Sequence, residues 1–365
     1  MNKLAFIFCL YLAPCLWSCQ STPAPSSDYM ILDEVKYIDR FPHVFTLTDG
    51  KPIDLDIIGT LSLSIYDSLL IVTTQDESGM WSFFELPELN YLGKYLTKGN
   101  GPNELLTPPW IEEQYIFKEQ GQHHAIIYEF LTGESYRMNI SETIRMNKLM
   151  MSETNYLLPR VLFGFSFIDS NIFFCKEVNN SQTQQNRYIL INGDKISSSN
   201  IEKLNRAQIN IGEDINILST CIKKRPNGIR IVEGGVFLNQ INVYSIDDSF
   251  GKTICLGNQV DNISRIQQIN RWDRLYTYLN VKVYPKFFSA LYLNDTYEKY
   301  QREITKNPVI QFFDWDCNPL AEIKLDRMIT TFDIDLINGS LYTLNFRTEE
   351  MYQYDISTII EQLFY

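Results

Sequence analysis

Short apolar runs separated by polar turns recur along most of the chain, and they come in pairs. Six pairs are found, at 66–75 with 80–96, 122–130 with 134–140, 168–178 with 186–196, 227–235 with 240–257, 287–295 with 308–326, and 337–347 with 350–357. Runs of this length with turn residues between them predict antiparallel β-strands. No long amphipathic helix is expected beyond residue 36.

The pairs repeat at intervals of roughly 50 residues, which is typical of β-propellers. Each pair belongs to a small sheet that cannot bury its apolar face alone, so neighbouring sheets must pack around a common axis. The sequence therefore predicts an all-β fold, a six-bladed β-propeller over residues 37–365. Residues 41–50 are predicted to supply the missing outer strand of the last blade and to join the two ends of the chain.

The N-terminal segment departs from this pattern. One positive charge precedes an apolar run over residues 4–17, which is typical of a signal peptide and shorter than a membrane span. Residues 1–18 are therefore predicted to be a signal peptide. The run ends in LWSC, Leu16 to Cys19, which resembles a bacterial lipobox whose cysteine receives the lipid. A plain secretory signal is the alternative.

Residues 19–36 are predicted to contain the lipidated cysteine and a flexible linker, because residues 20–28, QSTPAPSSD, have nothing to bury. Bacterial lipoproteins are sorted by the residue that follows the lipidated cysteine. Gln20 rather than aspartate follows Cys19, and this favours the outer membrane. The predicted location is the cell envelope, as an outer-membrane lipoprotein that faces the periplasm. The lipid on Cys19 would be its contact with the membrane.

Composition and charge narrow the set of partners. Aromatic residues make up 13 % of the chain, which favours half-buried β structure. Acidic residues outnumber basic ones by 44 to 32, which gives a net charge of −12. An acidic surface repels polyphosphate, so nucleic acid is not expected as a partner.

Four cysteines lie in the predicted mature domain, without a C-x-x-C pair that would indicate a zinc site. Cys175, Cys221 and Cys255 stand inside apolar strand-like runs. Buried free thiols are therefore expected. A disulfide between Cys221 and Cys255 is the alternative, because neighbouring strands bring Cα atoms within bridging range.

Two blocks of sequence resemble a known protein family. Residues 309–356 and KGNGPNEL, residues 98–105, resemble the TolB-like six-bladed β-propeller lipoproteins of the Bacteroides group. The resemblance extends diffusely from residue 30 to the C-terminus and implies the fold, but it leaves the activity open because the family's role is largely unassigned. Cys317 departs from the family pattern, which has glycine there. A left-handed turn residue would cost cysteine about 1 kcal/mol, so another form of the turn is expected.

The glycine stretch at 98–105 does not match a phosphate loop. No Lys-Ser or Lys-Thr follows Gly101, and Glu104 stands where a dinucleotide fingerprint needs a third glycine. The glycines are predicted to supply permissive backbone torsions, and the glutamate to accept backbone N–H bonds. The predicted role is a structural turn after the first blade, formed by Gly99, Gly101, Pro102 and Glu104.

Aromatic and basic residues in the irregular segment 269–308 provide candidate ligand-binding residues. Trp272 and Arg274 combine an aromatic face with a guanidinium group, as the rim of a glycan or peptide site does. Trp110, which follows a proline pair, is a similar candidate. Packing between blades is the alternative for these side chains.

Residues suited to catalysis are scarce. The chain has three histidines, of which His123 and His124 would point to opposite faces of a strand, and it has no G-x-S-x-G motif. No catalytic residue, metal ligand or cofactor is predicted. The expected function is a non-catalytic binding scaffold for a protein, peptide or glycan. The alternative is a calcium-dependent hydrolase or lactonase with its site at the central channel, because paired acids such as Asp54 and Asp56 suit calcium.

Overall fold

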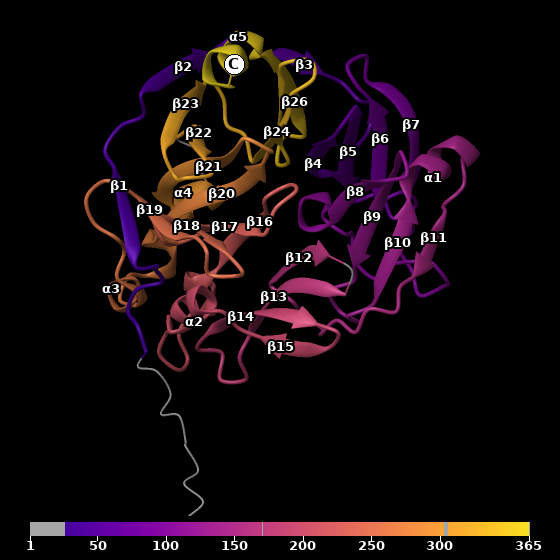
Figure 1. The fold of residues 1–365 in the computed structure, drawn as a ribbon. Helices are drawn as coiled ribbons and strands as arrows, with labels where there is room; N and C mark the ends of the chain where they lie inside the picture. The colour runs from indigo at the N-terminus through magenta and orange to yellow at the C-terminus, as the bar shows by residue number, and fades with distance from the viewer. Residues whose placement is uncertain (1–25, 170, 303–305, 365) are drawn as a thin grey trace, which may run out of the picture.

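Six small sheets stand in a ring around a central axis, and the chain is a six-bladed β-propeller (Figure 1). This computed structural model describes residues 26–169, 171–302 and 306–364. Each predicted pair of apolar runs contains the two middle strands of one blade. The fold prediction is confirmed.

The first three blades follow one another along the chain as four-stranded antiparallel sheets. The first contains β4 (Thr60–Tyr66), β5 (Leu69–Thr74), β6 (Trp81–Glu85) and β7 (Asn90–Tyr95). The second contains β8 (Tyr115–Glu119), β9 (Gln122–Tyr128), β10 (Ser135–Asn139) and β11 (Met151–Glu153). The third contains β12 (Gly164–Asp169), β13 (Ile172–Val178), β14 (Gln185–Ile191) and β15 (Asp194–Ile196). In each blade the first strand is the innermost.

The last three blades combine local strands with strands from the N-terminus. The fourth contains β16 (Thr220–Lys224), β17 (Arg230–Gly235), β18 (Gln240–Ser245) and β19 (Gly251–Leu256). The fifth contains β20 (Leu275–Val283), β21 (Phe287–Thr296), β22 (Val309–Asp314) and β23 (Pro319–Leu325). The sixth contains β24 (Thr331–Asp335), β25 (Ser340–Asn345) and β26 (Glu350–Asp355), and its outer strand is β3 (Lys51–Ile53).

The N-terminal segment runs around the outer rim of these three blades (Figure 1). β1 (Glu34–Ile38) pairs in parallel with β19, and β2 (His43–Leu47) pairs in parallel with β23. β3 then pairs antiparallel with β26 and closes the ring. Closure by residues 41–50 was therefore wrong in its position, because β2 covers the edge of the fifth blade and residues 51–53 complete the sixth. The rim strands cover edges that would otherwise expose unpaired backbone groups.

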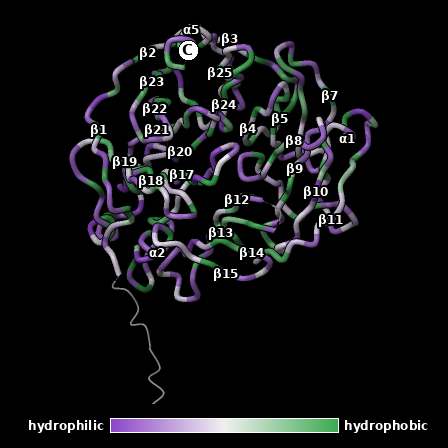
Figure 2. Tube along the Cα trace, viewed as in Figure 1, coloured by the Kyte–Doolittle hydropathy of each residue, from purple (hydrophilic) through white to green (hydrophobic). Residues whose placement is uncertain are grey.

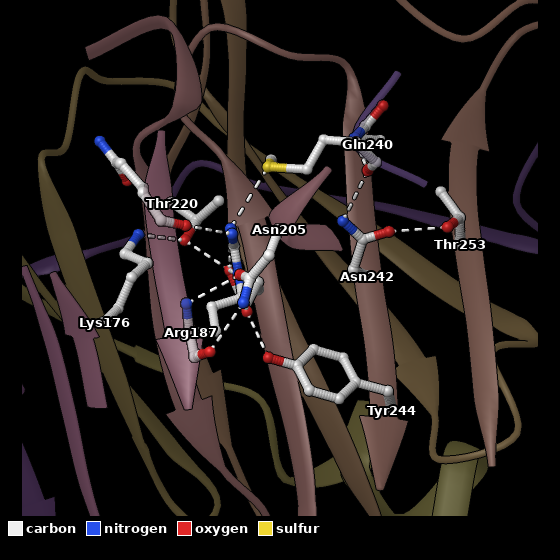
Figure 3. A network of polar contacts seen from close by, with 11 residues as sticks. Lys176, Arg187, Asn205, Thr220, Gln240, Asn242, Tyr244 and Thr253 are labelled. Atoms are coloured by element: carbon white, nitrogen blue, oxygen red, sulfur yellow. Dashed lines mark hydrogen bonds and ion pairs between the residues drawn. The ribbon is translucent and has the colours of Figure 1, made fainter. Parts of the chain in front are cut away.

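Residues 26–36 do not form the flexible linker that the sequence predicted. Met30 and Leu32 are 1 % and 2 % exposed, and they pack in the core between the third and fourth blades. The Met30 carbonyl accepts hydrogen bonds from the side chains of Gln240 and Asn242 (Figure 3). The apolar run YMIL, residues 29–32, thus holds the segment against the propeller through two buried side chains.

Hydrophobic clusters fill the interfaces between blades. Among the described residues there is one cluster for each of the six pairs of neighbouring blades, including the pair formed by the first and the last. Figure 2 shows hydrophobic stretches along the strands, interrupted by hydrophilic segments. Burial of apolar surface between sheets is therefore what holds the ring together.

Short helices occupy the connections. They are α1 (Ile140–Met146), α2 (Ser199–Asn205), α3 (Ile263–Gln267), α4 (Tyr297–Arg302) and α5 (Ser357–Phe364), with the 3₁₀ helices η1 (Ile111–Glu113), η2 (Ile215–Leu218) and η3 (Arg271–Asp273). None of these helices in the described ranges combines the length and apolar character needed to cross a membrane.

Candidate functional site

The candidate site is a cavity of about 460 Å³ on the propeller axis. The innermost strand of every blade contributes to its wall: β4, β8, β12, β16, β20 and β24. These strands surround the centre of the ring in Figure 1. A volume of this size is typical of pockets that bind small molecules.

The 3₁₀ helix η1 lies at one end of the cavity. The Glu112 carboxylate accepts hydrogen bonds from Asn280 Nδ2 at 2.7 Å and from the Thr331 hydroxyl. Asn280 belongs to the fifth blade and Thr331 to the sixth, whereas η1 belongs to the connection between the first and second blades. One carboxylate thus links the connection between the first two blades to the fifth and sixth blades, and it forms the floor of the cavity.

The other end of the cavity is its mouth. The turns that follow the innermost strands line it, through Asp67, Asn227, Pro285 and Ile337. Ile337 is 72 % exposed, which places this rim in contact with solvent. A ligand would therefore enter from the face on which the first and second strands of the blades are connected.

Two buried contacts fix the position of η1. The Trp81 indole Nε1 donates to the carbonyl of Pro109 at 2.6 Å, and the Ile111 backbone N–H donates to the Thr73 hydroxyl at 2.9 Å. Trp81 and Ile111 are both buried. The proline that precedes η1 is therefore tied to the core of the first blade, which directs the following acids onto the axis.

The glycine turn at 98–105 begins the same connection. The Glu104 Oε2 atom accepts from the backbone N–H of Gly101 at 2.7 Å. Neither glycine has a positive φ, and Asn103 takes the left-handed conformation with φ 62°. A Cβ on Gly99 would lie 2.0 Å from Glu104 Oε2. The glycines therefore make room for a carboxylate, and the permissive torsions expected of them are not used.

Lys282 pairs with both acids at the floor. Its ammonium pairs with Glu112 at 2.9 Å and with Asp333 at 3.4 Å, and it donates to the Leu63 carbonyl at 2.8 Å. Burial opposes the charge on Lys282, but the charges of Asp333 and Glu112 outweigh burial, so the pKa of Lys282 is raised. Each of these three groups therefore has an ionic partner, although the set keeps one excess negative charge.

Two other charged groups face the cavity without such partners. Within the described residues, neither the Glu113 carboxylate nor the Lys223 ammonium has a hydrogen bond or an ion pair. Burial raises the pKa of Glu113, and the Lys223 charge opposes that shift. Burial and the neighbouring Lys282 charge lower the pKa of Lys223. Each of the two charges shifts the pKa of the other group, but no hydrogen bond or ion pair joins them.

Aromatic side chains make up part of the remaining wall. Tyr66, Tyr115, Phe165 and Tyr284 all line the cavity. The Tyr284 hydroxyl donates to Asp333 at 2.7 Å, and burial raises the pKa of Tyr66 to about 12. These phenols therefore stay neutral at physiological pH, and the wall offers apolar faces beside the two unpaired charges.

The predicted ligand-binding residues lie outside the cavity lining. Trp110 is 38 % exposed and directly precedes η1, and Trp272 is 41 % exposed. Trp272 stacks on Tyr297 with ring centroids 5.5 Å apart. Arg274 is 5 % exposed, and its Nη1 pairs with Asp214 at 3.0 Å. The guanidinium thus has an internal partner, and the structure does not bring Trp110 and Trp272 together.

The cysteines give one confirmed expectation and two corrections. Cys175, Cys221, Cys255 and Cys317 are free, so the alternative of a Cys221–Cys255 disulfide is wrong: the two lie on β16 and β19, with two strands between them. Cys317 adopts φ 68° although the sequence predicted another turn. Its side chain is fully buried, and this packing offsets the strain. Cys19 lies outside the described residues.

The residues of the cavity carried weak signals in the sequence. Lys223 and Lys282 lie in the runs TCIKK and NVKV, where a charge interrupts an apolar segment. Both belong to innermost strands, which were not part of the predicted pairs. Glu112 and Glu113 follow the proline pair after Trp110 and Ile111. A charge inside a strand next to the axis is the signal that would have indicated them.

Among known proteins, the comparisons find solved structures whose chain trace is similar to that of this protein. No protein-family model matches the chain, and no curated protein matches it. A Bacteroides fragilis protein described as exported is 9 % identical with a TM-score of 0.49, over 82 % of this chain and 88 % of that one. A DUF4221 family member from Bacteroides vulgatus is 12 % identical with a TM-score of 0.49, over 83 % and 94 %. Regucalcin from Agrobacterium tumefaciens, a calcium-binding protein, is 9 % identical with a TM-score of 0.42, over 86 % and 95 %. The six-bladed assignment rests on this chain's own strand pairing.

Proposed function

We propose that the protein is a non-catalytic binding protein of the cell envelope, held to the outer membrane by a lipid on Cys19, which takes a peptide or another small polar ligand in its axial cavity. The observation that carries this proposal is the contrast between the charges inside the cavity. Lys282 is in contact with Glu112 and with Asp333, whereas Glu113 and Lys223 have no ionic partner among the described residues. Glu113 is exposed and Lys223 is half-buried, so a ligand in the cavity can reach both charges and pair with them.

A calcium-dependent hydrolase is less well supported by the donor set. The two acids at the floor of the cavity, Glu112 and Asp333, share one ammonium group between them. Calcium prefers a shell of oxygen ligands and would have to displace Lys282. Among the residues that the structure describes, no group of three or more histidine, cysteine, aspartate or glutamate side chains is arranged to hold a metal ion.

Thermal unfolding in the presence of fractionated culture medium tests the binding function. We expect at least one fraction of peptides or small polar molecules to raise the melting temperature of the wild-type protein. Ser166→Phe fills the wall of the cavity and should abolish that shift, whereas Ser197→Phe, at an exposed position away from the cavity, should retain it. The proposal fails if no fraction stabilises the protein, or if Ser166→Phe folds and responds as the wild type does.

A further inference from the structure

We infer that the axial cavity recognises a zwitterion: a free α-amino acid or short unblocked peptide whose carboxylate pairs with Lys223 and whose ammonium pairs with Glu113. This inference rests on the proposed binding function and names the class of ligand. It depends on one anion and one cation that line the same cavity, the anion from η1 and the cation from β16.

The first step is the inventory of charges around the cavity. Asp67 at the mouth is paired with Lys118 and with His123, each at 2.9 Å. The Lys224 ammonium donates to the carbonyls of Arg225 and Gly228, each at 3.2 Å. With the set around Lys282, these contacts account for every charged side chain of the lining except Glu113 and Lys223.

The second step is where the two remaining groups are held. Glu113 is the last residue of η1, which the contacts of Trp81 and Ile111 fix in place. Lys223 lies within β16, paired with Val232 of β17. Both backbones are therefore rigid, and the space between the two charges is preformed. A preformed site avoids the entropic cost of ordering its groups when a ligand binds.

The third step is the chemistry of the ligand. An anion alone would pair with Lys223 and leave Glu113 unpaired beside an added negative charge. A cation alone would pair with Glu113 and add positive charge beside Lys223 and Lys282. A molecule that carries both charges satisfies both groups at no change in the net charge of the cavity.

The fourth step is the remainder of the wall. Ile222, Val283 and Ile334 line the cavity together with the aromatic rings of Tyr115 and Phe165. These surfaces suit an apolar side chain beside the two charges. Leucine and leucyl-leucine are therefore appropriate probes.

Isothermal titration of the full mature protein in detergent with leucine and leucyl-leucine tests the inference. We expect a zwitterion to bind, and N-acetyl-leucine or leucinamide, each of which lacks one of the two charges, to bind at least about tenfold more weakly. Equal binding of the blocked and unblocked compounds would contradict the inference. So would the absence of heat with both zwitterions.

Two variants assign the charges. Lys223→Met should remove the preference for leucine over leucinamide, and Glu113→Gln should remove the preference for leucine over N-acetyl-leucine. Lys148→Met and Glu153→Gln change exposed residues away from the cavity and should preserve both preferences. Full selectivity in the folded Lys223→Met or Glu113→Gln protein would overturn the assignment.

The outcome separates this inference from the proposed function. If zwitterions fail to bind but a medium fraction still stabilises the wild type and not Ser166→Phe, the cavity binds another class of ligand and only this inference falls. If Ser166→Phe changes no response at all, both fall together.

Discussion

Arg187 of the third blade and Glu233 of the fourth form a bidentate ion pair with both side chains buried. The Arg187 Nε lies 2.8 Å from Glu233 Oε1, and Nη2 lies 2.8 Å from Oε2, with exposures of 1 % and 0 % for the two side chains. The Tyr244 hydroxyl and the Thr220 hydroxyl also donate to Glu233 (Figure 3). Because several hydrogen bonds hold both charged side chains in place, this pair fixes the position of the third blade against the fourth.

Removing one partner of this pair should destabilise the fold strongly. Glu233→Gln leaves the Arg187 charge buried without compensation, and we expect a loss of about 3–5 kcal/mol in the free energy of unfolding. Asp76→Asn, which breaks an exposed pair with Lys94, should cost at most about 1 kcal/mol. Urea denaturation measures both. Similar costs for the two variants would show that the buried pair is not a determinant of stability.

Lys176 makes stability depend on pH in the same region. Burial, together with the nearby Arg187 charge, lowers the pKa of Lys176 to about 7. Between that value and the ordinary lysine pKa, the unfolded chain binds a proton that the folded chain does not. The free energy of unfolding should therefore rise with pH across this window, by up to about 1.4 kcal/mol per pH unit.

Lys176→Met tests this pH dependence. The variant keeps the apolar stem and removes the ammonium, so it should flatten the rise in stability above pH 7 and should be more stable than the wild type below it. Urea denaturation at several pH values provides the comparison, with Lys195→Met, at an exposed site, as the matched control. An unchanged slope in Lys176→Met would show that another group is responsible.

Calcium should have no effect on the wild-type protein. Lys282 lies between Glu112 and Asp333, at 2.9 and 3.4 Å, where a cation would otherwise be bound. We expect the same melting temperature with millimolar calcium and with a chelator, measured by differential scanning calorimetry. A melting temperature that rises in calcium and falls with chelator would revive the hydrolase alternative.

The sequence predicted the middle strands of each blade because these strands are buried on both faces and end in turns. β5 and β6 read LLIVTT and WSFFE, and their apolar content alone identifies them. The rim strands could not be predicted in this way. β2 pairs with β23, more than 270 residues further along the chain, with His43 opposite Ala321, and no local pattern encodes such a pairing.

The residues of the cavity could not be predicted from the sequence for a similar reason. Glu112 and Thr331 are hydrogen-bonded, although 219 positions separate them in the chain. The fold alone brings such residues together, so the matched and unmatched charges become distinguishable only in three dimensions. The sequence candidates Trp272 and Arg274 were chosen for their residue types, and Arg274 already has a partner in Asp214.

Ligand affinity at the axial cavity should have a narrow pH optimum. A zwitterion pairs with ionised Glu113 and ionised Lys223. The pKa of Glu113 is raised by burial, which Glu112 reinforces and Lys223 opposes, so affinity should fall as pH drops through that raised value. The pKa of Lys223 is lowered by burial and by Lys282, against the acids Glu112 and Glu113, so affinity should fall again as pH rises through that lowered value. The neighbouring Cys221 stays neutral, because burial raises its pKa to about 12.

Each limb of this profile belongs to one residue. The dissociation constant of leucine measured by titration calorimetry across the pH range should show a bell whose limbs both lie nearer neutrality than those of an exposed carboxyl and an exposed ammonium. In Glu113→Gln the acid limb should move to the pKa of the ligand's own carboxylate, and in Lys223→Met the alkaline limb should move to that of the ligand's own ammonium. If both groups contact the ligand, their shifted pKa values must appear as the two limbs of the profile. A flat profile in the wild type would therefore mean that neither group contacts the ligand.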